Sequence, residues 1–251
     1  MQKMLGNTLL LIVLFVFFWN SGFIGAEYAI PYTQPFTLLF WRYLALSLIL
    51  LVYLVMKRRL YWPGMASAGY AAIIGLLSHG VWLGCVIIAL KEGVPAGIVA
   101  LVVALQPMAT GAFSGLATGE RTSGMQWLGL LIGFGGVFLV IFARISYAEV
   151  DAPGTFGYLI PFGSVIGITI ASLMQRRLEV MHKEKLLPVD SALFYQSIGT
   201  VLLVAAPAIF AEQLETAWSM PFIASMSWLI IAVSLLAYGL MWKLLARMDA
   251  T

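Results

Sequence analysis

The chain has 251 residues, of which 62% are hydrophobic and only 10% are charged, and its formal net charge is +3. Soluble domains average nearly half apolar and about a quarter charged residues. The composition therefore excludes an ordinary soluble protein and predicts an all-α membrane protein with several spans. We expect a lipid bilayer as its partner and no nucleic acid. The single cysteine, Cys85, excludes a disulfide within the chain.

Apolar runs long enough to cross a bilayer, which takes about 20 residues, occur eight times. We expect spans at residues 8–29, 34–56, 66–90, 94–118, 124–143, 155–175, 189–211 and 223–245. The short loops between them predict that consecutive helices are antiparallel neighbours. The first run is too long for a signal peptide, and no small-x-small cleavage site follows it, so we interpret it as a span.

The basic residues predict the orientation. Eleven of the 14 Lys and Arg residues fall in the N-terminus and in the segments on the same side of the predicted spans. The opposite loops hold two, Lys91 and Arg144, and Arg42 lies inside the second span. Because cytoplasmic loops carry the excess of Lys and Arg, we expect the N-terminus in the cytoplasm.

Small residues characterise the third to sixth spans, and a proline lies in the middle of the fourth. Gly-x-x-x-Gly pairs occur at 80/84, 93/97, 111/115, 115/119, 129/133 and 163/167. Helices in lipid associate by close approach at such residues, which predicts a compact bundle. Gln106-Pro107 lies in the middle of the fourth span, and backbone groups freed by a proline there need neighbouring helices or cavity water. We interpret that span as facing a cavity.

Polar residues inside spans are costly in lipid and are therefore functional candidates. The candidates for a substrate cavity are Trp19, Asn20, Arg42, His79, Trp82, Gln106, Gln196 and Tyr238. Glu27, near the outer end of the first span, is the carboxylate expected within a span and the candidate for proton coupling. Structural roles stay open: Arg42 could snorkel or pair with Glu27, and His79 could be a packed, hydrogen-bonded residue.

Chemistry-bearing motifs of other kinds are missing from the sequence. No His/Cys/Asp cluster has metal-ligand spacing, no glycine-rich nucleotide-binding loop occurs, and no soluble domain is present. The best acid–base pair, Glu27 and His79, is expected at two different depths. We therefore predict no catalytic residues, no metal and no cofactor, and do not expect an enzyme.

A short internal repeat links the second span to the seventh. Pro35 precedes PheTrpArg, and Pro188 precedes PheTyrGln; SerHisGly at 78–80 and AlaTyrGly at 237–239 lie in the third and eighth spans. An offset of five helices inverts the second copy in the membrane, as in many secondary transporters. This repeat makes Gln196 the counterpart of Arg42 and Tyr238 the counterpart of His79.

Several longer motifs are concentrated in the first half. They are PheTrpAsnSerGlyPheIleGly at 18–25, ProPheThrLeuLeuPheTrpArgTyr at 35–43, SerHisGlyValTrpLeuGly at 78–84, ValProAlaGly at 94–97, LeuGlnPro at 105–107, GlyGluArg at 119–121 and GlnTrpLeuGly at 126–129. Together they resemble the EamA family of the drug/metabolite transporter superfamily. The resemblance implies a polytopic 5+5 inverted-repeat helical bundle that exports, by alternating access, a small metabolite, an amino-acid-like compound or a toxic amphipathic solute. It also implies a multi-pass protein of the bacterial inner (plasma) membrane.

The same resemblance predicts how the chain is divided. Residues 1–147 correspond to the first repeat with spans one to five, and 148–251 to a shorter second repeat with spans six to eight, so about eight of ten helices are expected. Glu27 stands where family members often have a lysine. The short second repeat favours an alternative: a truncated, non-transporting membrane protein or a helical scaffold that needs a partner chain, for which a homodimer is one form.

Overall fold

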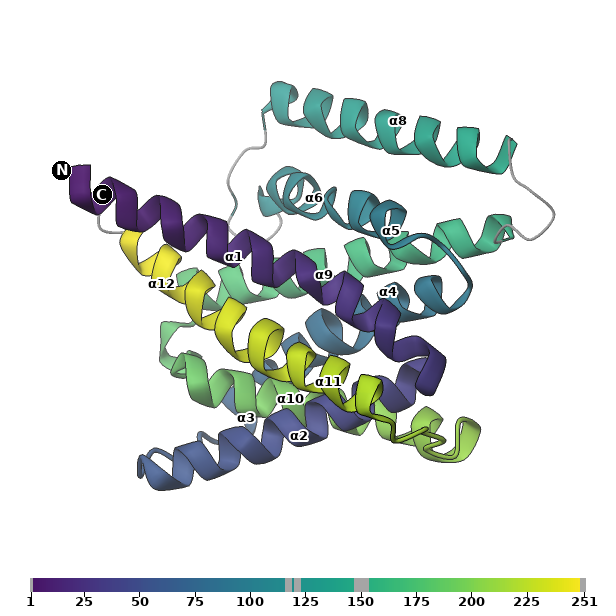
Figure 1. Ribbon diagram of the computed structural model, residues 1–251. Helices are drawn as coiled ribbons and strands as arrows, with labels where there is room; N and C mark the ends of the chain where they lie inside the picture. Colours follow the sequence, from purple (N-terminus) through teal and green to yellow (C-terminus); the bar gives the residue numbers. More distant parts are fainter. Residues whose placement is uncertain (1, 116–118, 120–122, 147–153, 249–251) are drawn as a thin grey trace. The chain divides into compact units, whose positions relative to one another are not determined.

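The computed structural model describes residues 2–115, 119, 123–146 and 154–248, and every regular element within these ranges is a helix (Figure 1). Seven helices are long and apolar enough to cross a membrane, and one further apolar helical stretch, Ala96–Ala112, is shorter. The predicted all-α class with several spans is confirmed. The chain forms two compact units, which are described separately.

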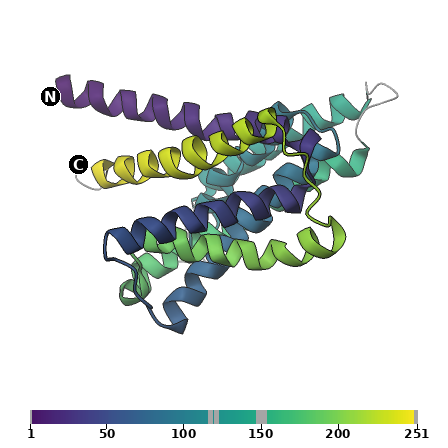
Figure 2. The same cartoon turned by 60° about the horizontal axis from the view of Figure 1, so that its bottom comes forward.

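The terminal unit consists of residues 1–33 and 216–251. Its elements are α1 (Gln2–Ala29), η1 (Ile30–Tyr32), α11 (Met220–Trp228), η5 (Leu229–Ala237) and α12 (Tyr238–Met248). The last three form one span, along which α1 packs (Figure 2). Gly22 and Gly25 allow this approach, because side-chain atoms of Val233 and Leu229 lie 3.2 and 3.1 Å from where their Cβ atoms would be.

The middle unit consists of residues 34–215. Its elements are α2 (Pro35–Met56), α3 (Met65–Gly75), η2 (Leu76–Val81), α4 (Trp82–Lys91), α5 (Ala96–Val103), α6 (Gln106–Ala112), α8 (Gly124–Ser146), α9 (Thr155–Met181), η3 (Lys183–Lys185), α10 (Val189–Ala206) and η4 (Pro207–Ala211). Helix α10 packs against α2 and α3, and α9 packs against α4, η2, α5 and α6. Figure 2 shows α2 and α10 side by side.

Two glycines allow a close crossing of α3 and α10. A Cβ atom on Gly75 would overlap the backbone of Gln196, and one on Gly199 would overlap the backbone of Ala72. The Oγ1 of Thr200 donates a hydrogen bond to the carbonyl of Gly75 at 3.1 Å across the crossing. Small residues thus bring two backbones together, as helices in lipid require, although neither glycine belongs to a predicted Gly-x-x-x-Gly pair.

The predicted Gly-x-x-x-Gly packing has mixed support. Gly163 and Gly167 on α9 lie against Cys85 and Val81, so this pair does allow close approach. Gly97, Gly111 and Gly129 have no heavy atom within 4 Å of a built Cβ. These three leave room for a methyl group, because their helices are not closely packed at those positions.

The fourth predicted span, 94–118, is divided into two short helices within the described residues. Helix α5 ends at Val103, and α6 begins at Gln106 after a turn. Pro107 explains the break, because it has no N–H to donate to the carbonyl of Val103 and its ring crowds that carbonyl. Leu105 instead closes a tighter turn onto Val102 at 3.0 Å. The predicted end of this span and Glu120 and Arg121 of the GlyGluArg motif lie outside the described residues.

The start of α2 is held by a carboxylate from a distant turn. Gln34, the residue before α2, makes no side-chain cap of its own. Instead Glu212, which follows η4, accepts hydrogen bonds from the backbone N–H groups of Phe36 and Thr37 at 3.1 and 2.6 Å and from the Thr37 hydroxyl at 2.8 Å. A negative charge is favourable at this end of a helix dipole, so Glu212 joins α2 to the end of the α10 span.

We expect Glu212→Gln to lower the free energy of unfolding by about 0.5–2 kcal/mol, the range for loss of a helix N-cap. The amide retains one acceptor oxygen but loses the charge and the second acceptor. Thermal unfolding of the purified protein in detergent measures the change. Glu92→Gln is the control, because it removes the same charge from an exposed turn residue. Equal unfolding temperatures for the two variants would show that the cap contributes nothing.

Candidate functional site

A buried histidine lies in a widened turn of the third span. His79 belongs to η2, a π-helical segment between α3 and α4, and only 1% of its surface is exposed. Segments of this kind often occur at functional sites. The Nε2 of His79 is 3.3 Å from the Oε1 of Gln196 on α10. An amide oxygen only accepts, so in this arrangement Nε2 carries the hydrogen and donates it.

Two residues of α2 lie close to His79. The Tyr43 ring stacks on the imidazole with centroids 5.0 Å apart, and the Arg42 guanidinium lies 5.5 Å from the centre of the Tyr43 ring. Arg42 is 4% exposed, so a cation is buried among apolar helices and contacts an aromatic face. We call Arg42, Tyr43, His79 and Gln196 the histidine cluster; α2, η2 and α10 together position it.

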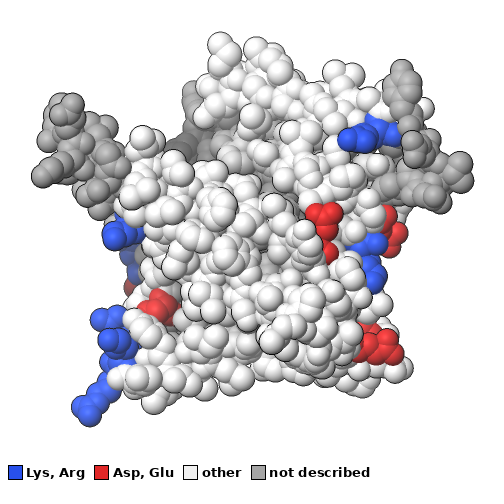
Figure 3. Space-filling view, in the orientation of Figure 1, with Lys and Arg blue, Asp and Glu red and all other residues white. Residues whose placement is uncertain are grey.

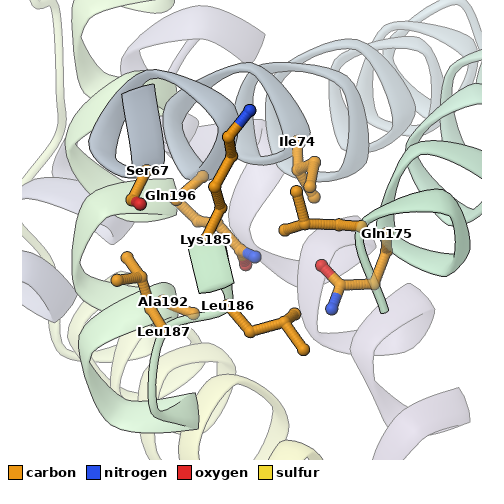
Figure 4. A pocket seen from close by; sticks show the side chains of 10 residues that line it. Ser67, Ile74, Gln175, Lys185, Leu186, Leu187, Ala192 and Gln196 are labelled. Carbon is orange, nitrogen blue, oxygen red and sulfur yellow. The ribbon is translucent and has the colours of Figure 1, made fainter. Parts of the chain in front are cut away.

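A small cavity adjoins the histidine cluster between α3, α9 and α10. It is lined by Ser67, Ala71, Ile74, Gln175, Leu178, Lys185, Leu186, Leu187, Ala192 and Gln196. Figure 4 shows the side-chain amides of Gln175 and Gln196 directed into it from two helices. Its volume of about 20 Å³ accommodates about one water molecule. Gln196 therefore contacts both this cavity and His79.

Gln106 makes a second polar group, separate from the histidine cluster. Its amide nitrogen donates to the hydroxyls of Thr110 at 3.2 Å and Ser172 at 3.3 Å, which ties α6 to α9. Thr169, one turn before Ser172, buries a hydroxyl for which the described part of the chain offers no hydrogen-bond partner. The break at Pro107 thus lies beside a polar stripe of α9.

The other predicted residues are placed as follows. Trp19 and Tyr238 contact each other in the terminal unit, with ring centroids 5.5 Å apart. Asn20 is exposed and donates to the carbonyl of Val16 within its own helix. Glu27 is also exposed, and its coupling role stays a prediction. Trp82 is buried at the start of α4, directly after the π-helical segment.

Sequence reasoning did not identify three residues of these sites. Tyr43 is the neighbour of Arg42, but a tyrosine in an apolar run gives no functional signal by itself. Ser172 and Gln175 are polar positions of the sixth span, three residues apart and thus neighbours on its helix. Their polarity inside a span was the available signal. No group of three His, Cys, Asp or Glu residues in the described ranges could hold a metal ion.

Comparisons with known proteins agree with this architecture. The model of the EamA-like transporter family matches residues 6–142. The chain is 33% identical over 122 residues to the uncharacterized inner membrane transporter YedA of Escherichia coli K12, a match that covers 49% of this chain and 39% of YedA. It is 29% identical over 244 residues to the uncharacterized transporter YvbV of Bacillus subtilis, covering 93% of this chain and 72% of YvbV.

No solved structure matches the chain significantly. The match to YedA spans less than half of that relative, whereas the match to YvbV spans nearly three quarters of it. The family model covers more than half of the chain and includes the second to fourth predicted spans, with Arg42, His79 and Gln106. The chain therefore belongs to the EamA-like transporter family.

Proposed function

We propose that the protein is a secondary transporter of the inner membrane that exports a small amphipathic solute by alternating access, with the histidine cluster as its solute site. The observation that carries this proposal is the burial of Arg42 and His79 among apolar spans, with the half-buried Gln196 within hydrogen-bond distance of His79. Polar groups inside a membrane protein are costly and usually line substrate paths. Family membership and the name of YedA support transport and the inner membrane.

The chemistry of the histidine cluster favours an amino-acid-like solute. The Arg42 guanidinium suits a carboxylate, because it can offer two parallel N–H donors to it. The Gln196 amide can both donate to and accept from a polar group, and the Tyr43 face provides apolar contact. Ligand sites commonly combine mostly apolar walls with a few such polar groups. Gln106 and its partners on α9 are the second candidate position for a polar group of the solute.

Helix pairing supports the inverted repeat that alternating access requires. In the terminal unit the first span packs on the eighth; in the middle unit the sixth packs on the third. The sixth span comes five spans after the first, and the eighth comes five spans after the third. The two packed pairs are therefore equivalent under the predicted repeat. Pro35 and Pro188 are 153 residues apart, as are Leu76 and Leu229, the first residues of the π-helical segments of spans three and eight. In this register Tyr195 and not Gln196 is the counterpart of Arg42, and Ala232 and not Tyr238 is the counterpart of His79.

The charge distribution of the middle unit supports a cytoplasmic N-terminus. The loop after α2 and the loop after α9 lie at the same end, where Arg59 pairs with Asp190 at 3.5 Å and the Tyr195 hydroxyl donates to the carbonyl of Tyr61. Figure 3 shows Lys and Arg side chains gathered at the end where α2 and α9 finish. Positive loops of this kind stay on the cytoplasmic side.

A tolerance screen tests the transport proposal. Cells that overproduce the protein grow with a panel of toxic amino-acid analogues and amphipathic compounds, and the control cells overproduce the Arg42→Gln variant at equal abundance. We expect the wild type to raise tolerance to at least one compound and the variant to raise none. If wild-type cells tolerate the whole panel no better than cells without the protein, export of this solute class is wrong. Equal tolerance with both proteins would remove the histidine cluster from the mechanism.

A further inference from the structure

A second, larger pocket lies at the end of the middle unit where α9 finishes. Its volume is about 300 Å³, and it is lined by Tyr70, Met174, Arg177, Leu178 and His182. Met174, Leu178 and His182 follow one another at intervals of four residues, so they form one stripe along α9 and into the residue after it. Tyr70 faces this stripe from α3. No residue of the pocket belongs to the histidine cluster.

Basic side chains lie in and beside the pocket. Arg177 is exposed on its wall, and the ammonium of Lys185 lies 5.2 Å from the centre of the Tyr70 ring. His182 adds an imidazole whose Nδ1 is 3.5 Å from a carboxylate oxygen of Glu184. Met174 and Leu178 supply an apolar wall. The pocket therefore combines cationic and hydrogen-bonding groups with a hydrocarbon-like surface.

The pocket lies where the membrane surface is expected. The apolar span of α9 ends at Met181, and Arg177 is four residues before that end, about 6 Å along the helix axis at 1.5 Å per residue. Arginine and tyrosine are common at this depth, because their polar ends reach the headgroup region while the rest of the side chain stays in the apolar layer. A group bound beside Arg177 would lie at the level of lipid phosphates.

We infer that this pocket binds the phosphate headgroup of an anionic phospholipid, with Arg177 and His182 at the phosphate, Lys185 above it and Met174 and Leu178 against an acyl chain. Basic pockets between membrane helices on the cytoplasmic side are suited to such headgroups. A phosphodiester offers oxygens that accept from guanidinium, imidazole and phenol N–H and O–H groups. The inference does not depend on which solute is transported, or on transport at all.

Native mass spectrometry of the full chain tests the lipid site. The protein is purified in micelles that contain equal amounts of phosphatidylglycerol and phosphatidylcholine with the same acyl chains, and retained lipids are counted. We expect phosphatidylglycerol to be retained at least about fivefold over phosphatidylcholine. Arg177→Gln should reduce that preference about fivefold, the effect of one Lys or Arg near a membrane surface, and His182→Ala should reduce it as well.

Lys57→Gln is the matched control, because it removes one positive charge from the same end outside the pocket lining. The inference is wrong if both lipids are retained equally, or if Lys57→Gln lowers the preference as much as Arg177→Gln. A second arm adds excess inorganic phosphate. Unchanged retention of phosphatidylglycerol supports a lipid site, whereas complete displacement by inorganic phosphate would make it a site for free phosphate.

Discussion

Alanine in place of Gly75 should destabilise the protein by about 3 kcal/mol or more and also abolish transport. The added methyl group would overlap the backbone of Gln196, and a backbone cannot rotate away as a flexible side chain can. Overpacking of a well-packed interface usually costs about 1–3 kcal/mol, and a clash with backbone belongs at the upper end. Because α10 must shift, Gln196 moves away from His79, and the site is lost with the crossing.

Thermal unfolding in detergent and the tolerance screen measure the two effects of Gly75→Ala. The control is Gly69→Ala on the same helix, where a built Cβ has no heavy atom within 4 Å. Alanine is the better helix former by about 1 kcal/mol, so this control should be neutral or slightly stabilising. If Gly75→Ala unfolds at the same temperature as Gly69→Ala, the close crossing of α3 and α10 is wrong.

Phenylalanine in place of His79 should reduce transport at least tenfold while leaving the amount of folded protein nearly unchanged. The phenyl ring can keep the stacking on Tyr43 but cannot donate to Gln196 or bind a polar group of the solute. A hydrogen bond contributes about 1 kcal/mol when both groups are neutral and about 1.5–3 kcal/mol when one is charged. Each 1.4 kcal/mol is a factor of ten in an equilibrium constant, so losing the bonds made by His79 corresponds to the tenfold loss that we expect.

Cys85→Ala is the control for His79→Phe. Cys85 lies six residues further along the same span, where its side chain faces Gly163 outside the histidine cluster. We expect its transport to equal that of the wild type. A His79→Phe variant that is abundant, folded and fully active would assign His79 a packing role alone.

The amino-acid sequence predicted the membrane class and most spans, because these depend on composition summed over about 20 residues. It also identified Arg42, His79 and Gln196 separately, since each is a polar residue in an apolar run. Their proximity depends on how α2, η2 and α10 pack against one another. This packing cannot be predicted from the pattern of residues along any one segment. Tyr43 was missed for the same reason: its importance comes from the imidazole stacked on its ring.

Two features of the fold needed the structure. Pro107 indicated that the backbone of the fourth span is disturbed. The sequence did not show that one helix would end before Ala104 and a second would begin after Leu105. Gly75 and Gly199 lie in different helices, so their shared crossing forms no motif along the chain. The predicted division into repeats at 1–147 and 148–251 is a relationship between sequences, and its boundary does not coincide with those of the two compact units. It stays a prediction.

Solute release from proteoliposomes tests the central claim most directly. Liposomes that carry the purified protein or its His79→Phe variant are loaded with the radiolabelled compound that scores highest in the tolerance screen, and its loss is followed over time. The account predicts faster release with the wild-type protein than from empty liposomes, and release at the empty-liposome rate with the variant. Wild-type release no faster than from empty liposomes, or equal release by both proteins, would contradict it.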